Sequence, residues 1–177
     1  MMVAINEVMI FEAFRNGDSR RTVELLLDAY QDEVYAYCCR LVGQKDAPKI
    51  YQQSIAWLVR DLNDLETSIS IRAWLFSIAR NVITQHHRKN DFPKALNPNY
   101  APISGPEKET AHRSLHQYLD QLDPTVQEML QLHLWHNLTT IEVAYVCDIP
   151  KDQVRDSLAT AMSNISVEIK HGFSTPS

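Results

Sequence analysis

The sequence predicts an all-α protein built from two small helical domains that are joined by a proline-rich linker. Apolar residues recur at steps of three and four along several stretches, which is the spacing of one face of an α-helix. The chain has only 4 glycines among 177 residues and lacks strand-like alternation of β-branched and polar residues. Its apolar content of 45% can supply cores of this size. The predicted boundaries are residues 1–90, 91–106 and 107–177 for the first domain, the linker and the second domain.

The first domain begins with a weakly patterned stretch, residues 4–15, that ends in the turn signal Asn16-Gly17-Asp18. A helix is predicted over about residues 19–41, and Gly43 is expected to end it. Its apolar residues line one face at steps of three and four: Leu26, Tyr30, Val34, Tyr37 and Leu41.

The next helix is expected to begin at Asp46, a suitable N-cap, with Pro48 in its first turn. Apolar residues continue along it: Ile50, Ile55, Leu58, Val59 and Leu62. Residues 63–70 are polar and are predicted to form a loop, in which Ser70 can cap the helix that follows.

Residues 71–89 change character along their length. Apolar side chains define one helix face: Trp74, Leu75, Ile78, Val82 and Ile83. A polar and basic run ends the stretch: Asn81, Gln85, His86, His87, Arg88 and Lys89. One interpretation is an amphipathic core helix with a solvated basic end, which the helix dipole favours. The other is a helix with one end that is buried and another end that binds an anion.

Residues 90–106 contain four prolines, a density that excludes a helix and predicts the linker. Beyond it, a helix is predicted over residues 107–121, and Asp123-Pro124 opens the next one as N-cap and N1 proline. Thr139 and Glu142 form a capping box for a short helix over residues 141–147. After Asp148-Ile149-Pro150, a last helix is predicted over residues 151–170. Such a helix-turn-helix usually places its second helix in the major groove.

Two motifs resemble those of a known family. Ala73-Trp-Leu-x-x-Ile-Ala-Arg-Asn81, with a basic dipeptide seven residues later, resembles the promoter-melting segment of the extracytoplasmic-function (ECF) group of the sigma-70 family. Leu122-Asp-Pro-Thr-Val-Gln and Leu138-Thr-Thr-Ile-Glu-Val-Ala144 resemble the C-terminal domain of the same group, which reads the −35 promoter element. The two motifs stand in the family's order, with a linker between them.

This resemblance implies that the protein binds core RNA polymerase and promoter DNA, that an anti-sigma factor regulates it, and that it needs neither catalysis nor a cofactor. The residues implied to contact the −10 element are Trp74, Asn81, Gln85, His86, Arg88 and Lys89. Those implied to contact the −35 element are Lys151, Gln153, Arg155 and Ser157. Those implied to face polymerase are Ile50, Gln52, Gln53 and Ile55.

The chain departs from the family pattern in two places. Pro48 and Lys49 stand where acidic residues are expected to face a basic polymerase surface. The last helix has Arg155 beside Asp152 and Asp156 where several arginines are usual, so an exposed, mixed-charge face is an alternative to a DNA-reading one. Residues 1–90 hold eleven charges of each sign, whereas residues 91–177 hold six basic and eleven acidic ones. A second hypothesis is therefore a sigma-like protein that binds an anti-sigma factor or another protein without productive promoter binding.

A third hypothesis, a small metal or redox enzyme, rests on the cysteines and on two histidine pairs. Cys38, Cys39 and Cys147 lack the spacing of a disulfide framework or a zinc site and are expected to be buried thiols in a reducing compartment. His112 with His116 and His133 with His136 have metal-compatible spacings, but the sequence places no third ligand nearby, so solvated histidines are the favoured explanation and no metal site is predicted. No signal peptide or membrane span is recognised, which predicts a soluble, cytoplasmic protein.

Overall fold

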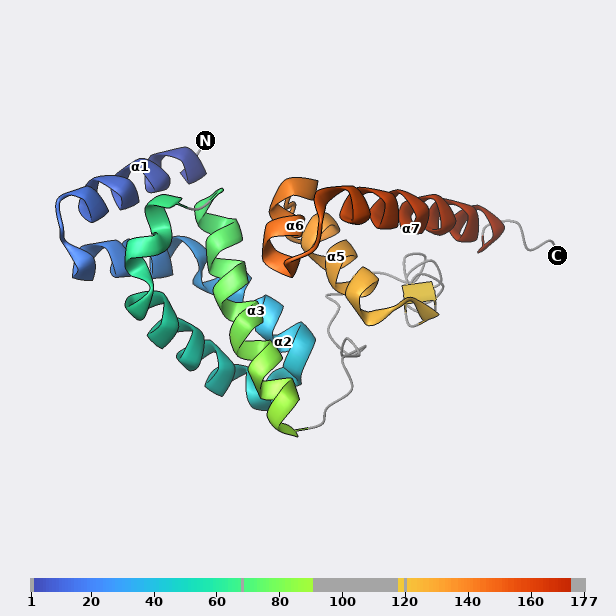
Figure 1. Ribbon diagram of the computed structural model, residues 1–177, viewed down its shortest axis with the longest axis horizontal. Coiled ribbons are helices and arrows are strands. Elements are labelled where there is room, and N and C mark those ends of the chain that lie inside the picture. The colour runs from blue at the N-terminus through green and yellow to red at the C-terminus, as the bar shows by residue number, and fades with distance from the viewer. Residues whose placement is uncertain (1, 68, 91–117, 120, 173–177) are drawn as a thin grey trace. The chain divides into compact units, whose positions relative to one another are not determined.

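The structure is a computed structural model that describes residues 2–67, 69–90, 118–119 and 121–172 (Figure 1). Every regular element within these residues is helical, as the sequence predicts. Contacts within the chain divide it into two compact units, Met1–Phe92 and Pro93–Ser177, and each is described by itself. The predicted linker, residues 91–106, and most of the helix predicted over residues 107–121 lie outside the described residues.

The first unit consists of α1 (Met2–Arg15), α2 (Ser19–Arg60), the short 3₁₀ helix η1 (Leu62–Thr67) and α3 (Ile71–Asn90). Both α1 and α3 pack against α2, which supplies the centre of the unit (Figure 1). Residues 4–15, whose pattern predicts no clear element, lie in α1, because burial of Ile10 and Ala13 in the core stabilises a helix with a weak pattern of its own. Most of η1 lies within the stretch predicted as a loop, residues 63–70.

The long helix α2 is broken at Gly43, whose φ of 79° and ψ of 161° are not helical. This confirms the predicted break, since few residues other than glycine adopt this conformation. The prediction that Asp46 caps the second part is wrong, because the helix already continues directly after Gly43 and Asp46 lies inside it. Asp46 instead contacts α3, as described below.

The predicted apolar face of α3 is confirmed: every one of its five residues is buried. Tyr37 of α2 packs edge-to-face on Phe76 of α3, with ring centroids 5.1 Å apart. The predicted face of the second part of α2 is only partly right, because Ile50 and Leu58 are buried whereas Val59 is exposed. The core of the unit therefore lies where α3 covers α2.

The second unit contains α5 (Pro124–Leu134), α6 (Thr140–Cys147) and α7 (Lys151–Gly172). The Asp123 carboxylate accepts a hydrogen bond of 2.8 Å from the Thr125 amide, which confirms the predicted N-cap. Between α6 and α7, Asp148 adopts the left-handed conformation, with φ of 54° and ψ of 50°. The three helices surround a core with these residues: Leu130, Leu132, Val143, Val146, Val154 and Leu158.

The sequence suggests that the three tryptophans are core anchors, and the structure bears this out for Trp74 alone. Trp57 is half-buried, with the Arg60 guanidinium carbon 4.5 Å from its ring centroid. Trp135 follows the end of α5 and keeps 37% of its surface exposed. Trp135 is exposed because it lies at the end of a helix, although its size and apolar character predicted burial.

Candidate nucleic-acid interface

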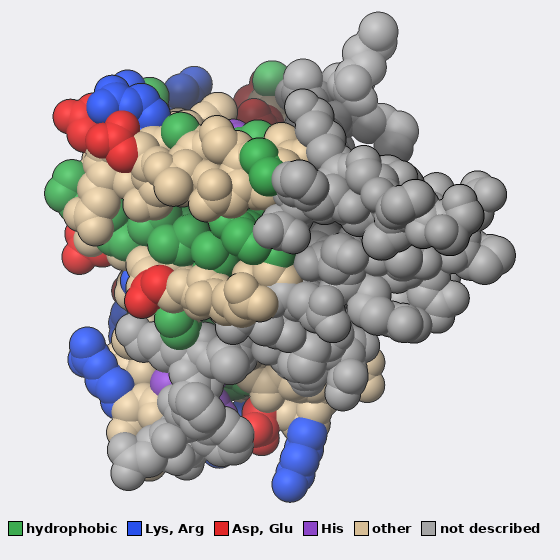
Figure 2. Space-filling model, turned by 90° about the vertical axis from the view of Figure 1, so that its right-hand side faces the viewer, with side chains coloured by type: hydrophobic (Ala, Val, Ile, Leu, Met, Phe, Trp, Pro, Cys, Tyr) green, Lys and Arg blue, Asp and Glu red, His purple; other side chains and the backbone are tan. Residues whose placement is uncertain are grey.

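An exposed polar stripe follows α3 on the side opposite its buried face. Asn81, Gln85, Arg88 and Lys89 are all exposed, and their steps of four, three and one place them on neighbouring positions of one helix surface. In Figure 2, Lys, Arg and His side chains reach the surface toward the bottom, the end at which Figure 1 places the C-terminus of α3. Two adjacent cations with amide donors beside them can bind phosphates and the edges of unpaired bases.

Two other residues predicted to contact the −10 element turn toward the protein interior and do not lie on this exposed stripe. Trp74 keeps only 2% of its surface exposed, so in this structure its ring is part of the core and cannot stack on a base. The His86 side chain is 12% exposed, and its Nε2 lies 3.7 Å from Asp46 Oδ2. The helical period explains both cases, because these positions turn toward α2 while the stripe turns away from it.

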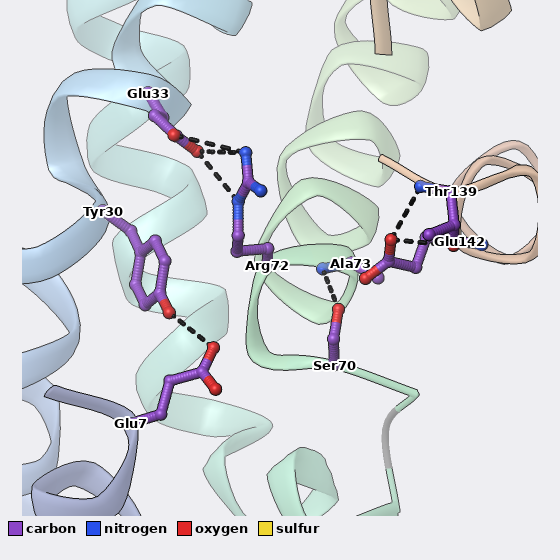
Figure 3. A network of polar contacts seen from close by, with 8 residues as sticks. All are labelled: Glu7, Tyr30, Glu33, Ser70, Arg72, Ala73, Thr139 and Glu142. Carbon is purple, nitrogen blue, oxygen red and sulfur yellow. Dashed lines mark hydrogen bonds and ion pairs between the residues drawn. The ribbon is translucent and has the colours of Figure 1, made fainter. Parts of the chain in front are cut away.

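The N-terminal end of α3 is held by its cap and by an ion pair with α2 (Figure 3). Ser70 Oγ accepts a hydrogen bond of 3.1 Å from the Ala73 amide, which confirms the predicted cap. Arg72 donates to both carboxylate oxygens of Glu33, with nitrogen–oxygen distances between 3.1 and 3.2 Å. At the other end, the basic residues His87, Arg88 and Lys89 occupy the last turn, where the helix dipole favours positive charge.

The surface predicted to face polymerase lies on the second part of α2. Gln52 and Gln53 are exposed and Ile55 is partly exposed, and Lys49 is exposed beside them. Ile50 is fully buried, with 0% of its surface exposed, so its side chain supports the helix from within and is not available to a partner. Lys49, which stands where the family pattern has an acidic residue, therefore lies on the surface that is predicted to face polymerase.

The residues predicted to read the −35 element lie along the start of α7. Lys151, Gln153 and Arg155 are exposed and Ser157 is partly exposed. The Arg155 guanidinium contacts two carboxylates of its own helix, Asp152 Oδ1 at 2.9 Å and Asp156 Oδ1 at 3.1 Å. The positive charge of Arg155, which would contact a phosphate, is therefore partly neutralised by two acidic neighbours.

The cysteines are buried free thiols, as predicted. Burial raises the pKa of the Cys38 thiol from 9.0 to about 12, and the neighbouring Cys39 contributes to the shift. A thiol that stays protonated at neutral pH is a poor nucleophile and a poor metal ligand. For Cys38, these properties fit a packing residue rather than redox chemistry.

The histidine pairs do not come together as a metal site in the part of the chain that the structure describes. His133 Nδ1 lies 2.8 Å from the Leu138 carbonyl oxygen, and His136 is buried. His112 and His116 lie outside the described residues. Among the described residues, no three His, Cys, Asp or Glu side chains gather in a way that could hold a metal ion. Nor does any helix there have the length and apolar character needed to cross a membrane.

Sequence reasoning missed two polar contacts that fix the first unit. Glu33 and Arg72 are 39 residues apart, and the Tyr30 hydroxyl donates to Glu7 across a separation of 23 residues at 2.9 Å (Figure 3). Burial, together with the hydrogen bond to Glu7, raises the pKa of Tyr30. One signal was present in the sequence: Arg72 is a cation in the first turn of a helix, where the dipole disfavours it unless an acid compensates.

The chain is similar to known proteins in both sequence and structure. Residues 26–92, which include α3 and most of α2, match the family model described as Sigma-70 region 2. The ECF RNA polymerase sigma-E factor of Haemophilus influenzae is 22% identical to this chain over 187 residues, which cover 96% of this chain and 98% of that protein. Over its length the chain is thus similar to an ECF sigma factor, and its residues 26–92 match region 2 of the sigma-70 family. Both motifs of the chain therefore lie within a match that runs through almost its whole length.

Two solved structures share the fold of this chain. CnrH in complex with the cytosolic domain of CnrY matches with a TM-score of 0.62 and 16% identity over 94% of this chain and 97% of the other. The sigma factor RpoE of Bartonella quintana, in complex with the anti-sigma factor NepR, also has a TM-score of 0.62, with 17% identity over 86% and 97% of the two chains. At these identities the likeness establishes the fold.

Proposed function

We propose that this protein is a cytoplasmic ECF sigma factor that binds core RNA polymerase and directs promoter recognition and melting. One observation carries the proposal: the stripe Asn81, Gln85, Arg88 and Lys89 is exposed on a rigid helix within the region-2 match. The buried face of α3 holds the helix in the protein. The basic residues at the end of its exposed face can then bind phosphates.

The chemistry of this role is binding and not bond making. Unstacking and flipping a base costs a few kcal/mol, which contacts to the flipped base and to phosphates offset. We assign the −10 contacts to Asn81, Gln85, Arg88 and Lys89, with His86 at the margin of the stripe. The −35 contacts are assigned to the start of α7 and the polymerase contacts to Gln52, Gln53 and Ile55 on α2.

An anti-sigma factor is the partner that we propose for regulation. Solved structures with this fold contain an anti-sigma factor, NepR, and the cytosolic domain of CnrY. Both units of this chain expose apolar side chains that a helical protein could cover, among them Val59 in the first unit and Tyr145 in the second.

The proposal is tested by reconstituting the protein with core polymerase and following promoter opening by permanganate footprinting. Arg88→Ala with Lys89→Ala should abolish open complexes and lower the salt slope of promoter binding by about two units, because two phosphate contacts are lost. Arg20→Ala with Arg21→Ala removes the same charge from the exposed start of α2 and serves as the matched control.

Two outcomes would contradict the proposal. If the wild-type protein binds a protein partner yet opens no promoter in a library, it is a sigma-like regulator without productive DNA binding. If promoters open equally well with Arg88 and Lys89 replaced, the assignment of the −10 contacts to α3 is wrong.

A further inference from the structure

The helix α3 contacts α2 on both sides of the break at Gly43. At its start, Arg72 forms the bidentate ion pair with Glu33, which precedes Gly43 in the chain. Near its end, His86 lies 3.7 Å from Asp46, which follows Gly43. The helix that carries the polar stripe therefore spans the two parts of α2.

Apolar packing joins α3 to α2 but leaves a pocket near this break. A mostly apolar pocket is lined jointly by the first part of α2, its second part and α3. Lining residues from these three segments include Leu26, Val34, Ser54, Leu58, Leu75 and Ile78. Hydrophobic contacts are non-directional, and the pocket leaves room at the surface where all three segments meet. A directional polar contact can add to this packing in setting the register.

The Glu33–Arg72 pair has the properties of such a contact. The side chains are 44% and 24% exposed, so both charges are partly removed from water. The planar guanidinium donates to both oxygens of one carboxylate, an arrangement that fixes orientation as well as distance. The first turn of α3 contains no acidic residue, and the dipole disfavours a cation there, so Arg72 does not serve the stability of its own helix.

The backbone at Gly43 is the reason that a contact bridging the two parts of α2 matters. With φ of 79° and ψ of 161°, Gly43 adopts a conformation that glycine reaches at little cost, and the regular helix geometry does not pass through it. The angle between the two parts of α2 thus depends on what bridges them. In the described residues of this unit, α3 makes the most extensive packing with α2 and reaches both parts.

We propose that Glu33 and Arg72 are positioning residues: they lock the start of α3 onto the first part of α2 and so determine where the polar stripe lies relative to the surface of Gln52 and Gln53. Neither residue touches DNA or polymerase in this role. The effect on promoter melting rests on the proposed sigma-factor function, whereas the effect on helix placement does not.

Charge reversal tests the placement directly. Nitroxide labels on cysteines introduced at Asp28 and Gln85, both exposed, report the distance between the first part of α2 and the end of α3. The three native cysteines are buried and should resist labelling. Glu33→Arg should broaden and shift the distance distribution, because it faces Arg72 with a like charge, and adding Arg72→Glu should restore it.

The matched control is Glu24→Arg, which makes the same reversal next to Arg20 and Arg21 within a single helix. It should leave the distance distribution unchanged. Circular dichroism of each variant establishes that the helices form. An unchanged distribution in Glu33→Arg, or a folded double variant that fails to recover, would overturn the positioning role.

The same variants in the reconstituted holoenzyme separate positioning from general loss of function. Affinity for core polymerase should stay within about twofold of wild type, as expected for a site away from the contact. Fluorescence of 2-aminopurine at the −10 element should show loss of base unstacking in Glu33→Arg and recovery in the double variant. If wild type unstacks no base while the label distances behave as expected, the sigma-factor proposal fails and the positioning role stands.

Discussion

Arg155 shows how neighbouring side chains change the charge that a single residue presents on the surface of α7. It is the one arginine of α7, and it contacts carboxylates both one turn before it and at the next position. Surface ion pairs of this kind are weak, yet acidic groups beside a phosphate-binding cation repel the same phosphate. We therefore expect Asp152 and Asp156 to affect the duplex affinity of the second unit as much as Arg155 does.

Removing these acids should strengthen DNA binding. We expect Asp152→Asn and Asp156→Asn each to raise affinity for a −35 duplex roughly twofold, because surface pairs have effects of this size. The steepness of the salt dependence should increase by about one unit when both are replaced. Fluorescence anisotropy across a salt series measures both quantities.

Asp148→Asn is the control for this gain. It removes the same charge in the same unit, and asparagine tolerates the left-handed conformation of that position. If Asp148→Asn raises the affinity as much as Asp156→Asn does, net charge and not release of Arg155 is responsible.

At the scale of elements, α6 depends on its capping box. The Thr139 hydroxyl accepts from the Glu142 amide at 3.3 Å, and the Glu142 carboxylate accepts from the Thr139 amide at 2.8 Å (Figure 3). A helix of 8 residues is too short to be stable alone, so its end contacts and its packing decide whether it forms. The connection between α6 and α7 can take its position only when α6 has formed.

Thr139→Ala should lower the free energy of unfolding of the second unit by about 1 kcal/mol, the usual loss for an N-cap hydroxyl. Urea denaturation followed by circular dichroism measures it. Thr160→Ala, at an exposed position within α7, should cost nothing because alanine is the better helix former. Equal destabilisation by both substitutions would show that the cap contributes little.

The elements that the sequence predicts well are those with local signals. Caps at Ser70, Asp123 and Thr139 are confirmed, because an N-cap is decided within three residues. The prediction of Asp46 as a cap is wrong although its residue type is right, since the helix begins earlier, after Gly43. The helix α1 was missed because packing against α2, and not its own pattern, stabilises it.

At the scale of the whole molecule, the two units have separate cores. We propose that they are independently folding domains. The fragments 1–92 and 93–177 should each be helical by circular dichroism and unfold cooperatively on heating, because each buries its own apolar side chains. A fragment that stays unfolded while the full chain folds would show that its core needs the rest of the protein.

The sequence by itself determined the helical class, the order of the two motifs, the helix caps and the buried face of α3, because each depends on residues within a few turns of one another. It also singled out the stripe from Asn81 to Lys89. Only the tertiary structure decided that Val59 and Trp135 stay exposed, that His86 turns toward Asp46, and that Glu33 holds Arg72. Those facts depend on which helix lies opposite, and contacts between distant residues leave no spacing in the sequence from which to infer them.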